Sequence, residues 1–174
     1  MDFDWNTEQQ DFRSTVRAFL EANLPDNWEE LAHGPGSKAQ TVFSKQFCGA
    51  LLVPHWPARW GGRDADPWIA FILAEEMWAA GEPRGGQYMN VNWIGPTLMR
   101  YGSQAQQARY IPPMARGATL WCQGFSEPEA GSDLASLRTR ADRHGDVYRI
   151  NGQKIWTSYA GHADTCFLLA RTSP

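Results

Sequence analysis

Apolar residues recur at helical spacing near the start of the chain. Phe12, Val16 and Leu20 lie four residues apart, so they fall on one face of a helix. Proline removes a backbone donor and clashes with the preceding turn, so Pro25 marks the end of this helix. Thr7, with a glutamine three residues later, has the form of a capping box and predicts where the helix begins.

Helical patterns continue to about residue 117, each with its own start or end signal. The segment 26–36 is predicted to be a loop between the first two helices. The further signals are Ser37 and Leu52 for one helix, Asp66-Pro67 and Gly81 for a second, Gly95 and Gly102 for a third, and Ser103-x-x-Gln106 and the interrupting Pro112-Pro113 for a fourth.

The pattern changes near Ala118, where β-branched and aromatic residues become frequent and the apolar spacing shortens. Leu137–Arg143 and Val147–Ile150 are predicted to be paired strands. Asn151-Gly152 is typical of a two-residue hairpin turn and predicts a further hairpin. Thr165–Arg171 predicts a last strand.

Helices followed by strands favour an α+β fold over alternating βαβ units. We expect an N-terminal all-α helical domain over residues 1–117, followed by an incomplete antiparallel β-barrel-like domain over residues 118–174. No G-x-G-x-x-G lies between a strand and a helix, which disfavours a Rossmann site. So few strands would leave unpaired edges, so the chain is expected to be truncated.

The composition disfavours several classes of function. The net charge is −3 and no basic cluster is long, which argues against binding to nucleic acid. No stretch approaches the roughly 18 apolar residues of a membrane span, and the polar N-terminus does not resemble a signal peptide. The odd, widely spaced Cys48, Cys122 and Cys166 predict buried thiols in a reducing cytoplasm. The four histidines lack ligand spacing, so no metal site is expected.

Two runs carry candidate chemistry. The first motif, Trp121–Asp133 (WCQGFSEPEAGSD), ends in small and hydroxyl residues that let backbone N–H groups approach an anionic ligand. The second motif, Lys154–Ser158 (KIWTS), offers an indole beside two hydroxyls. Together they predict a site for a planar, phosphate-bearing cofactor. The structural alternative is a tight polar turn with an Asx-like contact from Asp133, and a core or hairpin role for Trp156.

A carboxylate pair at Glu75-Glu76 invites a role as general base. Adjacent residues of a helix point about 100° apart, so the two carboxylates do not converge on one substrate. A solvated face or an interhelical salt bridge is the better interpretation. Glu127 lies inside the first motif and is interpreted as structural rather than catalytic.

The two motifs, in this order, closely resemble the acyl-CoA dehydrogenase family. In that family S/T-E-P-x-A-G-S-D lies along the flavin and the pyrophosphate of FAD, and K-x-W-x-T/S places its Trp and hydroxyl against the isoalloxazine. Pro54–Gly62 and Gly95–Ser103 also fit, so the resemblance spans nearly the whole chain. Glu129 departs from the small residue usual in the family and adds a negative charge near the expected pyrophosphate.

The resemblance implies FAD as the cofactor and a chain that holds the N-terminal domain and part of the middle domain. The catalytic Glu of the family belongs to a C-terminal helical domain that this chain lacks, so no catalytic residue is assigned. Ser132 is expected to contact the pyrophosphate or the thioester arm of the substrate. The residues expected to bind the cofactor are Gln123, Phe125, Ser126, Gly131, Ser132, Trp156, Thr157 and Ser158.

The implied reaction is FAD-dependent α,β-dehydrogenation of an acyl-CoA thioester, with the isolated chain inactive. The implied partners are an acyl-CoA substrate, an electron-transfer flavoprotein as acceptor, and further subunits of a homo- or hetero-tetramer. Trp93–Pro96 is expected to line the acyl pocket, and WCQGFSEP is most similar to members that accept bulky or branched acyl groups. Two alternatives are a flavin-dependent monooxygenase of the same fold and a non-catalytic partner subunit.

Overall fold

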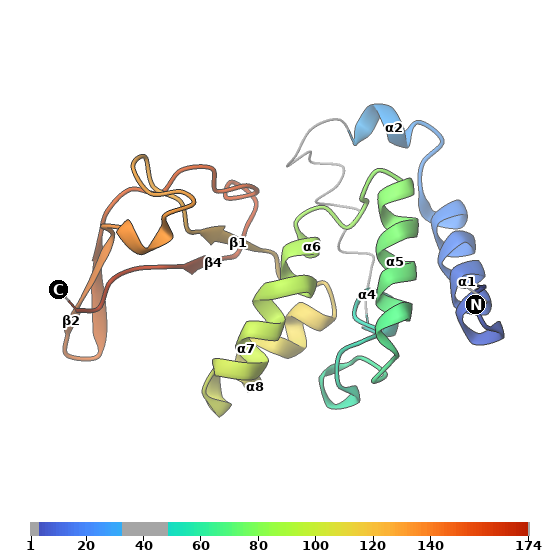
Figure 1. The fold of residues 1–174 in the computed structure, drawn as a ribbon, viewed down its shortest axis with the longest axis horizontal. Helices are drawn as coiled ribbons and strands as arrows, with labels where there is room; N and C mark the ends of the chain where they lie inside the picture. Colours follow the sequence, from blue (N-terminus) through green and yellow to red (C-terminus); the bar gives the residue numbers. More distant parts are fainter. Residues whose placement is uncertain (1–3, 33–48, 174) are drawn as a thin grey trace. The chain divides into compact units, whose positions relative to one another are not determined.

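The computed structural model describes residues 4–32 and 49–173 of the 174-residue chain. It divides into two compact units, Met1–Leu120 and Trp121–Pro174. The first unit is helical and the second contains short strands (Figure 1). The predicted fold class, helices followed by a small β region, is therefore confirmed.

The helical unit is built from short and medium helices. Its segment 26–36 was predicted to be a loop, but α2 forms one helical turn there, with its indole buried. The predicted helix end at Leu52 is confirmed, and the predicted start at Ser37 lies outside the described residues. The described elements are α1 (Thr7–Asn23), α2 (Trp28–Leu31), α4 (Gly49–Leu52), the 3₁₀ turn η1 (Ala58–Trp60), α5 (Pro67–Ala79), α6 (Gln87–Met89), the π-helical turn η2 (Asn90–Ile94), α7 (Gly95–Tyr101) and α8 (Gln104–Ala115).

The first helix begins with a capping box, one residue earlier than predicted. The Asn6 side chain accepts from the Gln9 N–H at 2.9 Å, and the Gln9 amide oxygen accepts from the Asn6 N–H at 3.0 Å. Asparagine caps at least as well as threonine, so the box forms on Asn6 rather than Thr7. The predicted apolar face is confirmed, because Phe12, Val16 and Leu20 are buried.

The helices α1 and α5 lie side by side and run in the same direction (Figure 1). Ion pairs connect them: Arg17 donates to Glu76 at 2.8 and 3.0 Å, and Arg13 pairs with Glu75. Arg13 also lies 3.5 Å from Glu76. The interhelical salt bridge predicted for the Glu75-Glu76 pair is therefore confirmed.

The prediction for the ends of α5 also holds. The Asp66 carboxylate accepts from the Trp68 N–H at 2.7 Å, and Pro67 occupies the first helical position. Beyond the last turn Gly81 adopts φ +71°, a left-handed conformation that glycine takes without steric cost.

In α8 the start was predicted correctly and the interruption was not. The side chains of Ser103 and Gln106 form the expected capping box. The helix continues through Pro112 and Pro113 to Ala115. The two prolines remove donors, but their carbonyls still accept from Arg116 at 3.3 Å and Ala118 at 2.9 Å, so the last turn stays helical.

The second unit contains β1 (Trp121–Gly124), the 3₁₀ turn η3 (Leu134–Ser136), β2 (Arg140–His144), β3 (Val147–Asn151) and β4 (Thr165–Leu168). The strands β2 and β3 form an antiparallel hairpin, as predicted. The strands β1 and β4 pair in parallel, which differs from the expected antiparallel arrangement. Parallel strands need a long connection, and the segment that holds β2 and β3 provides it.

The hairpin predicted at Asn151-Gly152 does not form. The strand β3 ends at Asn151, and Lys154 lies outside any strand. Gly152 has φ +155°, and a Cβ placed there would lie 2.3 Å from the Thr139 hydroxyl oxygen. Glycine is therefore required here by close approach to another segment rather than by a hairpin turn. The last strand is also shorter than predicted, because Arg171 makes only an isolated bridge, to Arg140.

None of the helices within residues 4–32 and 49–173 combines the length and apolar character needed to cross a bilayer. The cytoplasmic location stays a prediction.

The interior of the helical unit is dense around Trp56. Its indole N–H donates to the Val91 carbonyl at 3.1 Å, and a Cβ on Gly95 would lie 2.3 Å from two atoms of its ring. The fully buried apolar side chains of this unit include Leu52, Trp56, Ile69, Ile72, Leu73, Met77, Ile94, Ile111 and Met114.

Replacing Gly95 with alanine should lower the free energy of unfolding by about 1–3 kcal/mol, the usual cost of overpacking a core. The clash with Trp56 should outweigh the gain of about 0.5–1 kcal/mol that alanine normally gives in a helix. Urea unfolding of Gly95→Ala measures this. Gly161→Ala is the control, because a Cβ on Gly161 meets nothing within 4 Å. An unchanged or raised stability for Gly95→Ala would contradict the packing described.

Candidate functional site

The first motif begins as β1 and leaves the sheet at Phe125. Gln123 lies within β1, opposite Phe167 of β4 in the parallel ladder. The Phe125 and Phe167 rings pack against each other with centroids 5.8 Å apart. Ser126 follows, half-buried, at the point where the chain turns away from the strand.

A tight turn follows, with Pro128 and Glu129 at its tip. The Glu127 N–H donates to the Ala130 carbonyl at 2.8 Å, and the Ala130 N–H donates back to the Glu127 carbonyl at 3.2 Å. Ala130 is buried at the end of this turn. The turn therefore directs the chain into a loop that begins at Gly131.

Gly131 and Ser132 lie on this loop and are exposed to solvent. A Cβ on Gly131 would meet nothing within 4 Å, so no contact inside the chain requires glycine at this position. The Asx-like contact considered for Asp133 does not form, because its side chain makes no capping hydrogen bond at the start of η3. The Ser136 hydroxyl instead donates to the Asp133 backbone carbonyl at 2.8 Å.

The second motif is an irregular segment that exposes its indole. The Trp156 side chain is 84% exposed, and its backbone has φ +57°. A bulky residue rarely adopts this left-handed conformation, which costs about 1–3 kcal/mol and is concentrated at ligand-binding sites. The Ser158 N–H donates to the Trp156 carbonyl at 2.9 Å, Thr157 is half-buried and Ser158 is exposed. A core role for Trp156 is thereby ruled out.

Direct contacts bring the two motifs together. The Ile155 N–H donates to the Ser126 carbonyl at 2.9 Å. The Lys154 ammonium donates to the Phe125 carbonyl at 2.9 Å and to the Glu127 carboxylate at 2.8 Å. Trp156 therefore lies one residue beyond a hydrogen bond to Ser126. Gly131 and Ser132 lie on the separate exposed loop after the turn.

Glu127 is the centre of a buried polar network. Besides Lys154, its carboxylate accepts from the backbone N–H groups of Arg138 at 2.6 Å and Thr139 at 2.8 Å. Lys154 first, and then the donors at Thr139 and Arg138, hold the pKa of the Glu127 carboxyl far below its ordinary value. Such a carboxylate is a weak base, which fits its interpretation as structural.

Lys154 is the residue whose contribution was missed. The sequence shows it as one position of a motif, and its partner Glu127 lies 27 positions earlier. One signal was present: each motif contains a residue of opposite charge flanked by apolar neighbours, where a buried charge needs a partner.

The negative charge of Glu129 is compensated on the surface. Its carboxylate lies 2.8 Å from the Arg138 guanidinium, and both side chains are more than two-thirds exposed, at 71% and 79%. A pair this exposed contributes little to stability, at most about 1 kcal/mol.

The cysteines differ partly from the prediction. Cys122 is buried, as predicted, but Cys166 is exposed, and Cys48 lies outside the described residues. Cys166 lies on β4, where half of the strand's surface remains uncovered. Burial, together with the neighbouring Cys166, raises the pKa of the Cys122 thiol to about 11. This thiol is therefore protonated at neutral pH and is a poor nucleophile.

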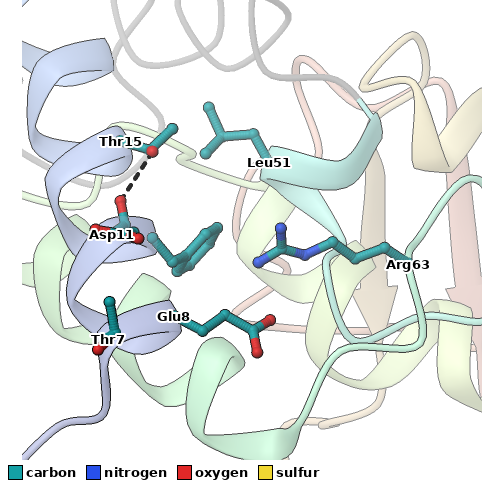
Figure 2. Close-up of a pocket in the computed structure, with 7 residues that line it drawn as sticks. Thr7, Glu8, Asp11, Thr15, Leu51 and Arg63 are labelled. Carbon is teal, nitrogen blue, oxygen red and sulfur yellow. Dashed lines mark hydrogen bonds between the residues drawn. The ribbon is translucent and has the colours of Figure 1, made fainter.

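The helical unit contains a cavity of about 630 Å³ with no part in either motif. Figure 2 shows the Glu8 and Arg63 side chains extending toward each other across it, with Asp11 and Thr15 on the same helix as Glu8. The Arg63 guanidinium also lies 4.8 Å from the centre of the Phe12 ring. Its rim is formed by solvated charged side chains, so we do not assign it a ligand. Within the described part of the chain, no group of three His, Cys, Asp or Glu side chains is arranged to hold a metal ion.

Comparison with protein families gives two adjacent matches. The model described as acyl-CoA dehydrogenase, N-terminal domain, matches residues 6–118. The model described as acyl-CoA dehydrogenase, middle domain, matches residues 122–174.

Similar curated proteins carry the same family name. Acyl-CoA dehydrogenase IpdE1 of Mycobacterium tuberculosis is 38% identical over 94% of this chain and 44% of its own length. Acyl-CoA dehydrogenase FadE26 of the same organism is 33% identical over 100% of this chain and 44% of its own length. The chain thus spans less than half the length of these relatives.

Solved structures agree in fold. The steroid ACAD Tcur3481-Tcur3483 is 35% identical with a TM-score of 0.91, over 100% of this chain and 46% of that one. The ChsE4-ChsE5 complex from Mycobacterium tuberculosis is 31% identical with a TM-score of 0.87, over 100% of this chain and 44% of that one. A glutaryl-CoA dehydrogenase from Mycobacterium smegmatis in complex with FADH2 is 26% identical with a TM-score of 0.81, over 97% and 44%.

Glu127 should make stability depend on acidity. Because its folded-state pKa is depressed, its contribution is complete above the ordinary glutamate pKa of about 4.3 and declines below it, until it is lost as pH falls through the folded-state pKa. Urea unfolding should therefore show Glu127→Gln clearly less stable than the wild type at pH 7, with the difference shrinking as pH falls below about 4.

Glu129→Gln is the matched control on the same turn. Its ion pair is exposed, so its effect should stay under about 1 kcal/mol at either pH. A Glu127→Gln difference that does not depend on pH would contradict the role of the ionised carboxylate.

Proposed function

Because the chain belongs to the acyl-CoA dehydrogenase family, we propose that it supplies flavin- and thioester-facing parts of an FAD-dependent acyl-CoA dehydrogenase. The observation that carries this proposal is the Trp156 indole, exposed on a left-handed backbone and connected to Ser126 through the Ile155 N–H. We assign residues 1–117 to the N-terminal domain and 118–174 to the middle domain. The two compact units, which meet at Leu120 and Trp121, support this assignment.

The residues present fit an isoalloxazine ring. The indole of Trp156 offers an exposed flat apolar surface, and the neighbouring hydroxyls of Thr157 and Ser158 offer hydrogen bonds at its edge. The backbone at the end of β1 provides further polar groups. We propose that FAD contacts Gln123, Phe125, Ser126, Trp156, Thr157 and Ser158.

The exposed loop fits an anionic group. Gly131 leaves open space above the backbone, so a phosphate could approach without meeting a side chain. We propose that Gly131 and Ser132 face the pyrophosphate of FAD and that Ser132 also faces the thioester arm of the substrate. The pairing of Glu129 with Arg138 reduces the repulsion that a phosphate would otherwise meet here.

The proposed reaction is α,β-dehydrogenation of an acyl-CoA thioester. A base removes the α-proton, hydrogen bonds to the thioester carbonyl stabilise the developing enolate, and a hydride leaves the β-carbon. Bound FAD would accept that hydride. The described carboxylates examined for a base are all engaged: Glu127 by Lys154, and Glu75 and Glu76 by arginines. We therefore place the base outside residues 4–32 and 49–173.

For the substrate we propose a bulky, ring-bearing acyl group. The likeness to a structure titled steroid ACAD supports this choice. So does the aromatic cluster of Trp78, Tyr88 and Trp93, whose neighbouring centroids lie 5.9 and 5.3 Å apart. Within the predicted pocket segment only Trp93 has this role, because Ile94 and Gly95 are buried in the core around Trp56.

For partners we propose a second subunit of the same family and an electron-transfer flavoprotein as acceptor. Two of the similar structures, Tcur3481-Tcur3483 and ChsE4-ChsE5, are titled as complexes of two differently named chains. This supports a hetero-oligomer over a single chain.

The protein expressed from its complete reading frame should carry FAD, and a ring-bearing acyl-CoA should reduce it without oxygen. Loss of the visible absorption of oxidised flavin measures this reduction. A flavin that only a nicotinamide reduces would contradict the dehydrogenase and favour a monooxygenase. Trp156→Ala should weaken FAD binding about tenfold, since an aromatic pair adds about 0.5–1.5 kcal/mol beyond its area. Trp68→Ala, another exposed indole, should leave it unchanged.

Gly131→Ala tests the open loop. A methyl group there meets nothing inside the chain, so the free energy of unfolding should change by less than about 0.5 kcal/mol. The same methyl group would occupy the space proposed for the pyrophosphate and should weaken FAD binding, measured by titration of the apoprotein. Gly161→Ala, equally open but outside the motifs, should change neither. Unchanged FAD affinity in Gly131→Ala would contradict the assignment of this loop.

A further inference from the structure

One ion pair in the β unit is buried, whereas the others described there are exposed. The Lys154 and Glu127 side chains are 11% and 7% exposed and lie 2.8 Å apart. The Arg140–Asp142 pair is about half exposed, at 54% and 47%, and spans 3.3 Å. Burying charges costs free energy unless they are paired and hydrogen-bonded, so a pair kept inside so small a unit needs a reason.

This pair joins three separate segments. Glu127 accepts from the Arg138 and Thr139 N–H groups as well as from Lys154. Lys154 also donates to the Phe125 carbonyl. The pair therefore sets the distance between the end of β1 and the backbone that leads into Trp156.

The hydrogen bond from Ile155 to Ser126 depends on the same arrangement. It spans 2.9 Å between the residue after Lys154 and the residue before Glu127. No ladder of a β-sheet extends between these two segments among the described residues, so side-chain contacts must maintain their register.

We propose that Lys154 and Glu127 are positioning residues that hold Phe125–Ser126 against the Trp156 segment and balance the charge beside the flavin. This inference rests on the proposed function for its electrostatic part. Its geometric part concerns the chain alone and can be tested without a cofactor.

The charge balance gives the inference a distinctive consequence. Removing Glu127 leaves an uncompensated ammonium next to the segment proposed to contact the ring, and a positive charge favours the more negative, reduced flavin. Removing Lys154 leaves a carboxylate that still accepts two backbone N–H groups and so stays ionised. The two variants should therefore shift the flavin reduction potential in opposite directions, whereas loss of packing alone would shift both the same way.

The experiment uses Glu127→Gln, Lys154→Met and the double variant, with Asp142→Asn as the control from the exposed pair. Hydrogen exchange at the Ile155 amide should quicken at least tenfold in both single variants and stay unchanged in the control. In the FAD-bound protein from the complete reading frame, the reduction potential should rise in Glu127→Gln and fall in Lys154→Met. In the double variant, which removes both charges, it should return close to the wild-type value.

Potentials that move in the same direction, or do not move, would overturn the charge balance. Unchanged exchange at Ile155 would overturn the positioning role. If either single variant does not fold, the double variant still decides, because it restores neutrality: a wild-type potential supports the proposal and a shifted one overturns it. If the wild type binds no FAD, the proposed function fails, and the exchange experiment alone then decides the positioning role.

Discussion

A buried ion pair is the contact on which the β unit depends most. Lys154 and Glu127 come from segments that no strand pairing connects, and each also hydrogen-bonds to backbone groups of the other motif or of a third segment. In a low-dielectric interior such a network is strong when every group is satisfied and costly when one is missing. The relative position of the two motifs is therefore decided by charge and hydrogen bonding rather than by a sheet.

The two units reach their stability by different means. The helical unit buries large side chains such as Trp56 around its central helices and adds ion pairs at the rim of α1 and α5. In the β unit every residue of β3 is exposed, with Val147 and Ile150 at 64% and 52%. So little apolar burial leaves a larger share of the stability to polar contacts. Membership of the acyl-CoA dehydrogenase family accounts for both patterns, since its N-terminal and middle domains match these two parts.

Local chemistry made much of the fold predictable. Capping signals such as Asp66 and Ser103 act within one helical turn, so they were visible in the sequence. Contacts over long sequence distances were not: Asn151-Gly152 has the form of a hairpin turn, but that glycine is required by Thr139. For the candidate site, the motif residues and the structural role of Glu127 followed from the sequence. The exposure of Trp156 and the partner of Lys154 depend on tertiary structure.

The parallel pairing of β1 with β4 has a consequence for how the chain folds. Its first paired residues, Trp121 and Thr165, are 44 positions apart, whereas the hairpin pairs His144 with Val147. Closing a long loop costs more chain entropy than closing a short one, so the hairpin should form early and the outer pair late. Until the outer pair forms, the buried half of β1 stays open to solvent, which makes this step the one most exposed to aggregation during synthesis.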